Sequence, residues 1–326
     1  MRNLFIPADD AAKLIDEGRT LLVAAPEAVL ASLPRGRWVG GTTPYFMGPQ
    51  GGVVAQDRVF CTVLDEAIDS RIVVLPPADL PRVTAGRFRN GFTFMLLPAF
   101  STAHSCYALE GPTYPGLYTQ PMIGWITGIA LPDIGKVSPK VVDGSTGTAD
   151  DNAAMLMHVS LPDHIHAEVD IVNLFTQGIG DVITFDAGGF SATTCQVNGT
   201  PARLADYLRS KSIDTRLPLV ADYAGAMINV SFQSVQDDTV QFYAPVVAGV
   251  RYRVAAPIAD YGSSYRGACT SADAEGQFSC NCILNFLYAG LEGNRTGGFV
   301  GPVTFGEIAY ILLNQTLVRL ALLPTG

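Results

Sequence analysis

Glycine and proline recur at short intervals along this chain, with 33 glycines and 21 prolines among 326 residues. Both residue types end helices and strands and favour tight turns. A bundle of long helices is therefore excluded, and we expect short elements joined by many turns.

Low charge accompanies this turn-rich pattern. Charged residues make up 16% of the chain and apolar residues 48%, whereas roughly 25% of an average soluble domain is charged. Such a chain is too apolar to be disordered and long enough to bury a large core. Its formal net charge of −9 disfavours a general nucleic-acid binder, because those proteins carry basic surfaces.

The sequence shows no targeting or membrane signal. Residues 1–18 include acidic residues where a signal peptide has about 7–15 apolar ones. The apolar stretch Gly91–Phe100 is far shorter than the roughly 18 residues that a membrane helix needs. We therefore expect a cytoplasmic protein without a membrane span, with its six cysteines reduced.

The order of expected elements predicts an α+β fold. Acidic residues after Pro7 and a stop at Gly18 indicate a first helix, and we expect further helices over Leu80–Asn90 and Ala202–Ser210. Short apolar or alternating runs predict strands, among them Thr20–Ala25, Met155–Val159, Phe190–Val197, Phe278–Cys282 and Thr316–Leu322. We expect a strand-rich fold in two parts, with mixed sheets flanked by a few helices, divided into residues 1–210 and 211–326.

Four histidines are candidate metal or haem ligands. His164 and His166 share one face of an extended segment. With His158 or Cys106 nearby they are able to ligate an ion or a haem iron. The alternative is that these three histidines and His104 are surface or loop residues, since the spacing matches no strong metal signature.

The pair Cys280 and Cys282 forms a C-x-C pattern on one face of an expected strand. One interpretation is a thiol sensor or a soft-metal site. The other is that both are small buried residues, because free cysteine is among the most buried residue types.

A lone carboxylate, Glu307, stands among apolar neighbours. It is expected either to pair with an arginine, Arg266 or Arg295, or to face a pocket. Such a pair is either structural or a site for a small zwitterion. In the first half, Gly40, Gly41 and Thr42 let the backbone approach either a ligand or a neighbouring strand closely.

Several segments together resemble the two halves of the FIST sensory domain. The C-terminal resemblance is carried by Phe278–Cys282, by the run from Gly301 to Ile308 and by Leu313–Leu317. The N-terminal one is carried by Val39–Thr42 and by the stretch from Val197 to Ala202 followed by Tyr207. The chain departs from the family pattern where Asn281 and Cys282, and no arginine, follow Cys280, and where Leu313 replaces a histidine.

The resemblance implies a non-catalytic sensory protein of signal transduction that binds a small, amino-acid-like molecule. It also implies a separate signalling partner, such as a kinase or a cyclase, and some similar proteins are haem-based nitric oxide sensors. We place the ligand between the two halves, at a site built from Gly40, Gly41, Thr42, Cys280, Asn281, Glu307 and Asn314. Two alternatives stay open, a haem sensor that uses a histidine and a thiol-dependent enzyme that uses Cys280 or Cys282. The low charge also makes a homo-oligomer plausible.

Overall fold

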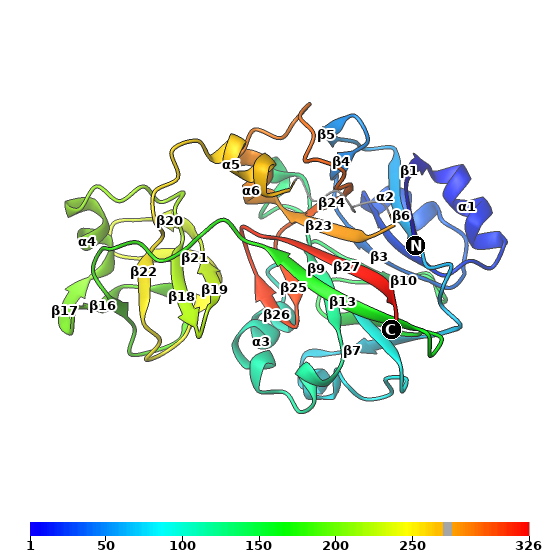
Figure 1. Cartoon of the computed structure of the whole chain (residues 1–326), viewed down its shortest axis with the longest axis horizontal. Helices are drawn as coiled ribbons and strands as arrows, with labels where there is room; N and C mark the ends of the chain where they lie inside the picture. The colour runs from blue at the N-terminus through cyan, green and yellow to red at the C-terminus, as the bar shows by residue number, and fades with distance from the viewer. Residues whose placement is uncertain (270–275, 326) are drawn as a thin grey trace.

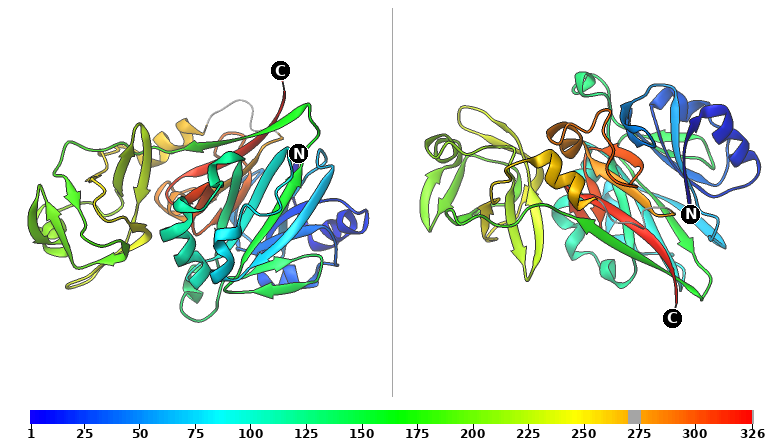
Figure 2. Two further views of the ribbon diagram at one scale, coloured as in Figure 1. Left: turned by 90° about the horizontal axis from the view of Figure 1, so that it is seen from below. Right: turned by 45° about the horizontal axis from the view of Figure 1, so that its top comes forward.

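The computed structural model describes residues 1–269 and 276–325 and has the expected α+β architecture (Figure 1). Its strands form four six-stranded sheets and one three-stranded sheet within these residues. Three sheets make a large body, and the other two make a smaller lobe that stands apart from it in every view (Figures 1 and 2).

The first sheet of the body lies near the N-terminus. Its strands β2 and β3 run parallel, and α2 (Glu27–Ser32) connects them because parallel neighbours need a crossover. Helix α1 (Ala8–Asp16) follows the first strand. In spatial order the strands are β1 (Arg2–Pro7), β6 (Arg58–Val63), β2 (Leu21–Ala25), β3 (Trp38–Thr42), β10 (Val141–Asp143) and β11 (Thr148–Asp150).

The second sheet contains the strand β8, whose eight residues are all buried. Helix α3 (Thr102–Glu110) makes the crossover from β8 to its parallel neighbour β9. The order is β26 (Ile311–Leu313), β25 (Glu307–Ala309), β9 (Met122–Thr127), β8 (Gly91–Pro98), β12 (Ala154–Ser160) and β7 (Asp69–Leu75). Short 3-10 helices surround it: η1 (Pro77–Arg82), η2 (Gly111–Thr113), η3 (Leu117–Thr119) and η4 (Leu131–Asp133).

The third sheet joins the C-terminal strands to a hairpin from the first quarter of the chain. Helices α5 (Tyr261–Ala268) and α6 (Ile283–Tyr288) lie beside it. The order is β13 (Ile165–Val172), β27 (Leu317–Pro324), β23 (Phe278–Cys282), β24 (Gly301–Thr304), β4 (Tyr45–Gly48) and β5 (Gly51–Val54).

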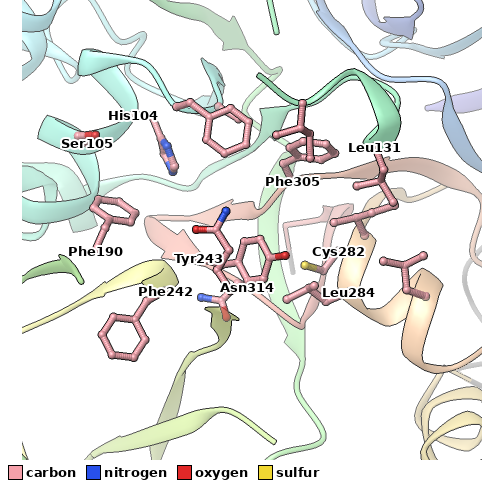
Figure 3. A pocket seen from close by; sticks show the side chains of 16 residues that line it. His104, Ser105, Leu131, Phe190, Phe242, Tyr243, Cys282, Leu284, Phe305 and Asn314 are labelled. Atoms are coloured by element: carbon pink, nitrogen blue, oxygen red, sulfur yellow. The ribbon is translucent and has the colours of Figure 1, made fainter. Parts of the chain in front are cut away.

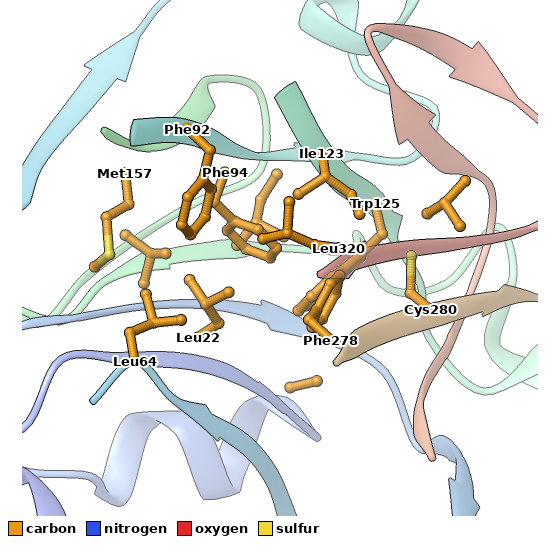
Figure 4. Packing of buried hydrophobic residues seen from close by; sticks show 14 of the residues in the cluster. Leu22, Leu64, Phe92, Phe94, Ile123, Trp125, Met157, Phe278, Cys280 and Leu320 are labelled. Carbon is orange, nitrogen blue, oxygen red and sulfur yellow. The ribbon is translucent and has the colours of Figure 1, made fainter. Parts of the chain in front are cut away.

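One aromatic core holds the three sheets of the body together (Figure 4). The Phe94 ring lies 5.1 Å from that of Trp125 and 5.4 Å from that of Phe278, edge-on in both contacts. Such ring pairs contribute about 0.5–1.5 kcal/mol each beyond their burial. Leu22 of the first sheet belongs to the same cluster, so the three sheets cannot separate without exposing it.

The small lobe has a core of its own. The Phe185 ring contacts Phe242 and Tyr252 edge-on, at centroid distances of 6.1 and 5.8 Å. The larger sheet of the lobe is β17 (Thr200–Arg203), β16 (Thr194–Val197), β14 (Ile183–Thr184), β22 (Tyr252–Val254), β18 (Leu219–Tyr223) and β19 (Ala226–Val230), and the smaller is β15 (Gly189–Ala192), β21 (Val240–Val246) and β20 (Phe232–Val235). Helix α4 (Leu204–Ser210) packs on this core.

Two expected helices differ from the structure. Over Leu80–Asn90 only η1 forms before a series of turns, because Pro81 and a left-handed Gly86 prevent a longer helix. The helix expected over Ala202–Ser210 begins at Leu204. Pro201 lies instead in β17, an edge strand, where its missing N–H leaves no ladder bond unmade.

The expected division of the chain into residues 1–210 and 211–326 does not coincide with the sheets, because most of the sheets contain strands from both parts. Strands β14 and β16, before residue 210, share a sheet with β18 and β22, which follow it. Strand β24 pairs with β4 from the opposite end of the sequence. The lobe is an insertion between β13 and α5, and the body is completed by the last part of the chain (Figure 1).

Gly41 offers a test of how closely the first two sheets pack. A Cβ atom at this position would lie 2.5 Å from Cγ2 of Thr127 and 2.9 Å from Nε1 of Trp125. We expect Gly41→Ala to lower the free energy of unfolding by about 1–3 kcal/mol, because overpacking forces neighbours apart. Urea denaturation measures the loss. The control is Gly180→Ala, where a Cβ would meet nothing within 4 Å, and equal stability of the two variants would contradict the prediction.

Candidate functional site

A cavity of about 290 Å³ lies between the body and the small lobe (Figure 3). The lobe contributes Phe190 from β15, Gln233 from β20, and Phe242 and Tyr243 from β21. The body contributes the start of α3, η4, the end of β23, helix α6 and the loops on either side of β25 and β26. Cavities between two structural units are a usual place for small-molecule sites.

The cavity wall is apolar and uncharged. Among the described residues that line it, none is aspartate, glutamate, lysine or arginine. Five aromatic side chains contribute to it: Phe100, Phe190, Phe242, Tyr243 and Phe305. The few polar groups are those of His104, Ser105, Gln233, Asn314 and the Tyr243 hydroxyl. Such a wall suits a mainly apolar ligand that is oriented by a small number of hydrogen bonds.

His104 is held in the cavity wall by the start of α3. Ser101 caps this helix, because its Oγ accepts a hydrogen bond from the backbone N–H of His104 at 3.0 Å. The imidazole is only 7% exposed, and its centroid lies 5.4 Å from that of the Phe190 ring. Burial lowers the pKa of His104 to about 4, so the ring is neutral at pH 7.

The rim of the cavity carries a strained residue. Phe100 has a φ of 66°, a region that bulky side chains rarely adopt. Its side chain is 54% exposed and contacts the Phe305 ring edge-on at 6.1 Å. Gly128 makes room for that ring, because a Cβ there would lie 2.5 Å from Cδ1 of Phe305. Backbone strain of this kind often accompanies ligand sites.

Asn314, a predicted ligand-binding residue, lines the cavity but uses its amide to hold the lobe. Its Oδ1 accepts hydrogen bonds from the N–H of Ser231 at 3.0 Å and from the Ser231 hydroxyl. Its Nδ2 donates to the carbonyl of Asn229 at 3.0 Å, and Asn229 Nδ2 donates back to the Asn314 carbonyl at 3.1 Å. The Asn314 side chain therefore connects the body to the lobe by hydrogen bonds.

The two residues after Asn314 add further hydrogen bonds to this connection between body and lobe. Gln315, with a φ of 53°, donates from Nε2 to the carbonyl of Arg216 at 3.0 Å, and its Oε1 shares the single hydroxyl hydrogen of Ser231 with Oδ1 of Asn314. Thr316 turns back into the body, where its hydroxyl donates to Oε2 of Glu307 at 2.6 Å. One tripeptide thus connects the lobe with the buried carboxyl group of the body.

Glu307 is fully buried and pairs with no arginine. Its Oε1 accepts no hydrogen bond of good geometry from residues 1–269 or 276–325. Burial raises its pKa to about 8, although hydrogen bonds from Thr316 and the Cys282 thiol moderate the rise. The carboxyl group is therefore largely protonated at pH 7, and it is not among the residues that line the cavity.

The cysteine pair is divided between core and cavity. Cys280 lies in the aromatic core and its thiol donates to the carbonyl of Gly124 at 3.4 Å, whereas Cys282 lines the cavity. Burial raises the pKa of both thiols well above the usual range, and Glu307 adds to the rise. A protonated, buried thiol is a poor nucleophile. Between them, Asn281 accepts hydrogen bonds from Tyr265 and Asn285 at 2.5 and 3.0 Å.

The predicted residues of the first half lie in β3, away from the cavity lining. Gly40 and Gly41 allow close packing, since a Cβ on Gly40 would lie 2.9 Å from the Trp38 ring. The Thr42 hydroxyl accepts from the N–H of Lys140 at 2.9 Å and borders a separate, smaller hollow of about 110 Å³. The structure therefore brings only Asn314, of the seven predicted binding residues, to the cavity.

The histidines considered as metal or haem ligands are dispersed. His158 is buried in β12, with Nδ1 2.9 Å from Oγ1 of Thr93, while His166 pairs with Glu168 on an exposed face of β13. In the part of the chain that the structure describes, no three His, Cys, Asp or Glu side chains gather where they could hold a metal ion. All six cysteines are free thiols.

Comparison with known proteins identifies a family. A model of the family of unknown function DUF6976 matches residues 6–323. The chain belongs to this family. No curated protein matches it. Within the described residues, no helix combines the length and apolar character that a membrane crossing requires.

Sequence reasoning missed most of the cavity wall. Phe190, Phe242 and Tyr243 lie in strands of the lobe and look like ordinary strand residues in the sequence. For His104 the sequence offers one local signal: Ser101, three residues earlier, is a residue type that favours the N-cap position and so indicates the start of a helix. Nothing in the sequence shows that this start faces the lobe.

Removal of the Asn314 side chain tests whether its hydrogen bonds stabilise the attachment of the lobe to the body. Asn314→Ala leaves the Ser231 N–H and the Asn229 carbonyl without partners, so we expect a loss of about 1–3 kcal/mol in the free energy of unfolding. Urea denaturation without any ligand measures the change. The exposed Gln236→Ala serves as the control, and an Asn314→Ala variant as stable as this control would refute the structural role.

The raised pKa of Glu307 predicts a pH-dependent stability. An ordinary glutamate ionises near pH 4.5 in the unfolded chain, whereas Glu307 stays neutral in the folded protein up to about pH 8. Folding then retains a proton that the unfolded state releases, so wild-type stability falls as pH rises through this window. Glu307→Gln lacks this titration.

We therefore expect the stability of wild type relative to Glu307→Gln to decrease from pH 5 to pH 8, the window set by the pKa of about 8. Urea denaturation at several pH values measures this, with the exposed Glu292→Gln as a matched control. A constant difference between wild type and Glu307→Gln would be inconsistent with a buried neutral carboxyl group.

Proposed function

We propose that the protein binds a small, mainly apolar molecule between the body and the lobe and acts as a non-catalytic sensory protein. The observation that carries the proposal is the cavity of about 290 Å³, which both parts of the molecule line and which no charged side chain of residues 1–269 or 276–325 borders. A cavity of roughly 150 Å³ is enough for benzene, so a somewhat larger molecule fits here.

The position of Asn314 supports a sensory role. This residue lines the cavity and also forms three of the hydrogen bonds that hold the lobe. A ligand that packs against it changes the free energy of the lobe's attachment, because both use the same surface. The output then passes to a separate partner, such as the kinase or cyclase that the FIST resemblance implies, in a cytoplasmic setting.

The geometry favours an uncharged ligand over the alternatives. An amino-acid zwitterion would leave two charges without partners in an apolar wall, which is costly. The volume suits a molecule smaller than haem, and the histidine at the cavity is His104 rather than His158, His164 or His166. The protonated thiol of Cys282 gives a thiol enzyme little support.

A pocket-filling variant tests the proposal. Gln233 is exposed at the rim of the cavity, so Gln233→Trp fills the space without disturbing a core. Gln236→Trp, three residues further along and outside the cavity, is the matched control. A panel of uncharged aromatic and aliphatic molecules and of amino acids is screened by thermal shift, because a ligand at 100 times its Kd stabilises by about 2.7 kcal/mol.

Wild type and Gln236→Trp are expected to bind at least one uncharged member of the panel. Gln233→Trp is expected to bind it at least about tenfold more weakly, a difference of about 1.4 kcal/mol. Equal binding by Gln233→Trp, or stabilisation by amino acids alone, would count against this site and this class of ligand.

A further inference from the structure

One buried polar atom in the cavity wall lacks a partner. Nε2 of His104 makes no hydrogen bond to any described residue, although the side chain is more than nine-tenths buried. Leaving a buried hydrogen-bonding group unpaired costs free energy, so such groups normally have a partner. His104 lines the cavity, but Nε2 itself has almost no accessible surface in the empty cavity, so a molecule in the cavity supplies that partner only when a neighbouring side chain shifts to admit it.

The surroundings of this atom are aromatic. The Phe190 ring packs against the imidazole from the lobe, and Phe305, which lines another part of the wall (Figure 3), contacts the Phe100 ring edge-on. Phe242 and Tyr243 complete the wall from the lobe. Aromatic rings pair favourably in tilted and edge-to-face geometries, so this wall suits a flat aromatic ligand.

The chemistry of Nε2 selects the polar group of the ligand. A neutral imidazole donates from one nitrogen and accepts at the other, and either tautomer leaves Nε2 in need of a partner. A hydroxyl group both donates and accepts, so it satisfies Nε2 in either tautomer. A carboxylate is disfavoured, because no cationic side chain borders the cavity among the described residues.

We infer that the cavity takes an uncharged aromatic molecule with one hydroxyl group, whose ring packs between the phenylalanines and whose hydroxyl hydrogen-bonds to Nε2 of His104. This inference rests on the proposed function of the same cavity and adds the class of ligand and the residue that selects it. The volume of about 290 Å³ leaves room for a ring with a short substituent.

Three probes of similar shape test this selection by titration calorimetry: para-ethylphenol, ethylbenzene and the para-ethylbenzoate anion. Wild type is expected to bind para-ethylphenol about tenfold more tightly than ethylbenzene, because only the phenol gives Nε2 a partner. It is expected to bind the anion most weakly. Binding of ethylbenzene and para-ethylphenol with equal affinity would overturn the inference, as would preferred binding of the anion.

Variants of His104 assign the preference to this residue. His104→Phe keeps a ring against Phe190 but removes the hydrogen-bonding atom, so it is expected to bind ethylbenzene as before and to lose the preference for the phenol. His104→Gln restores a polar group and is expected to regain part of the preference. The exposed His164→Phe is the control and keeps the wild-type preference. An unchanged preference in His104→Phe would refute the role of His104.

Nuclear magnetic resonance of the wild-type protein gives a test that needs no folded variant. The Nε2 resonance of His104 is expected to shift on addition of para-ethylphenol and to move much less with ethylbenzene. If ethylbenzene binds wild type but not Gln233→Trp, and the phenol has no advantage, only the selection by His104 fails. If none of the uncharged probes binds wild type, the proposed apolar ligand fails with it.

Discussion

The hydrogen bonds of the tripeptide Asn314–Thr316 are the constraint on which the arrangement of body and lobe depends. Asn314 and Gln315 bind Ser231 of the lobe, while Thr316 binds the buried Glu307. The turn needs a left-handed backbone at Gln315, which costs free energy for a residue other than glycine. The hydrogen bonds that Asn314, Gln315 and Thr316 make in this conformation, to the lobe on one side and to the body on the other, offset that cost.

This constraint also explains why the cavity is uncharged although polar groups surround it. The side-chain amide of Asn314 is hydrogen-bonded to Ser231 and Asn229. The carboxyl group of Glu307 is hydrogen-bonded to Thr316 and does not line the cavity. What faces the cavity is therefore mostly carbon, with His104 as the polar group that lacks a partner among the described residues. The low charge content of the sequence thus corresponds, at this place, to an apolar cavity.

Much of the fold followed from local sequence pattern, whereas the site did not. The Gly and Pro spacing predicted short elements, and the first helix and the strand Phe278–Cys282 lie where expected. Glu307 was expected to pair with an arginine or to face a pocket, and Asn314 to bind the ligand, whereas their hydrogen-bond partners are Thr316 and, for Asn314, Ser231, which lies 83 residues earlier. Alternation along a strand shows which side chains share a face, not whether that face meets a core or a cavity. The sequence therefore could not show that the lobe residues Phe190, Phe242 and Tyr243 line a cavity.

The proposed sensory role requires that a ligand bind more tightly in one arrangement of body and lobe than in another, since only differential affinity shifts a population. Here the wall is divided between two units: His104 and Phe305 belong to the body, and Phe190 and Phe242 to the lobe. A ligand that contacts both sides would lose its contacts with the lobe if the lobe moved away, and the same movement would break the hydrogen bonds of Asn314 to the lobe. Under the proposed function, ligand binding and lobe attachment would therefore favour the same arrangement. A molecule too small to touch both walls would bind without favouring this arrangement, so under the proposed function the size of the ligand would decide whether binding produces a signal.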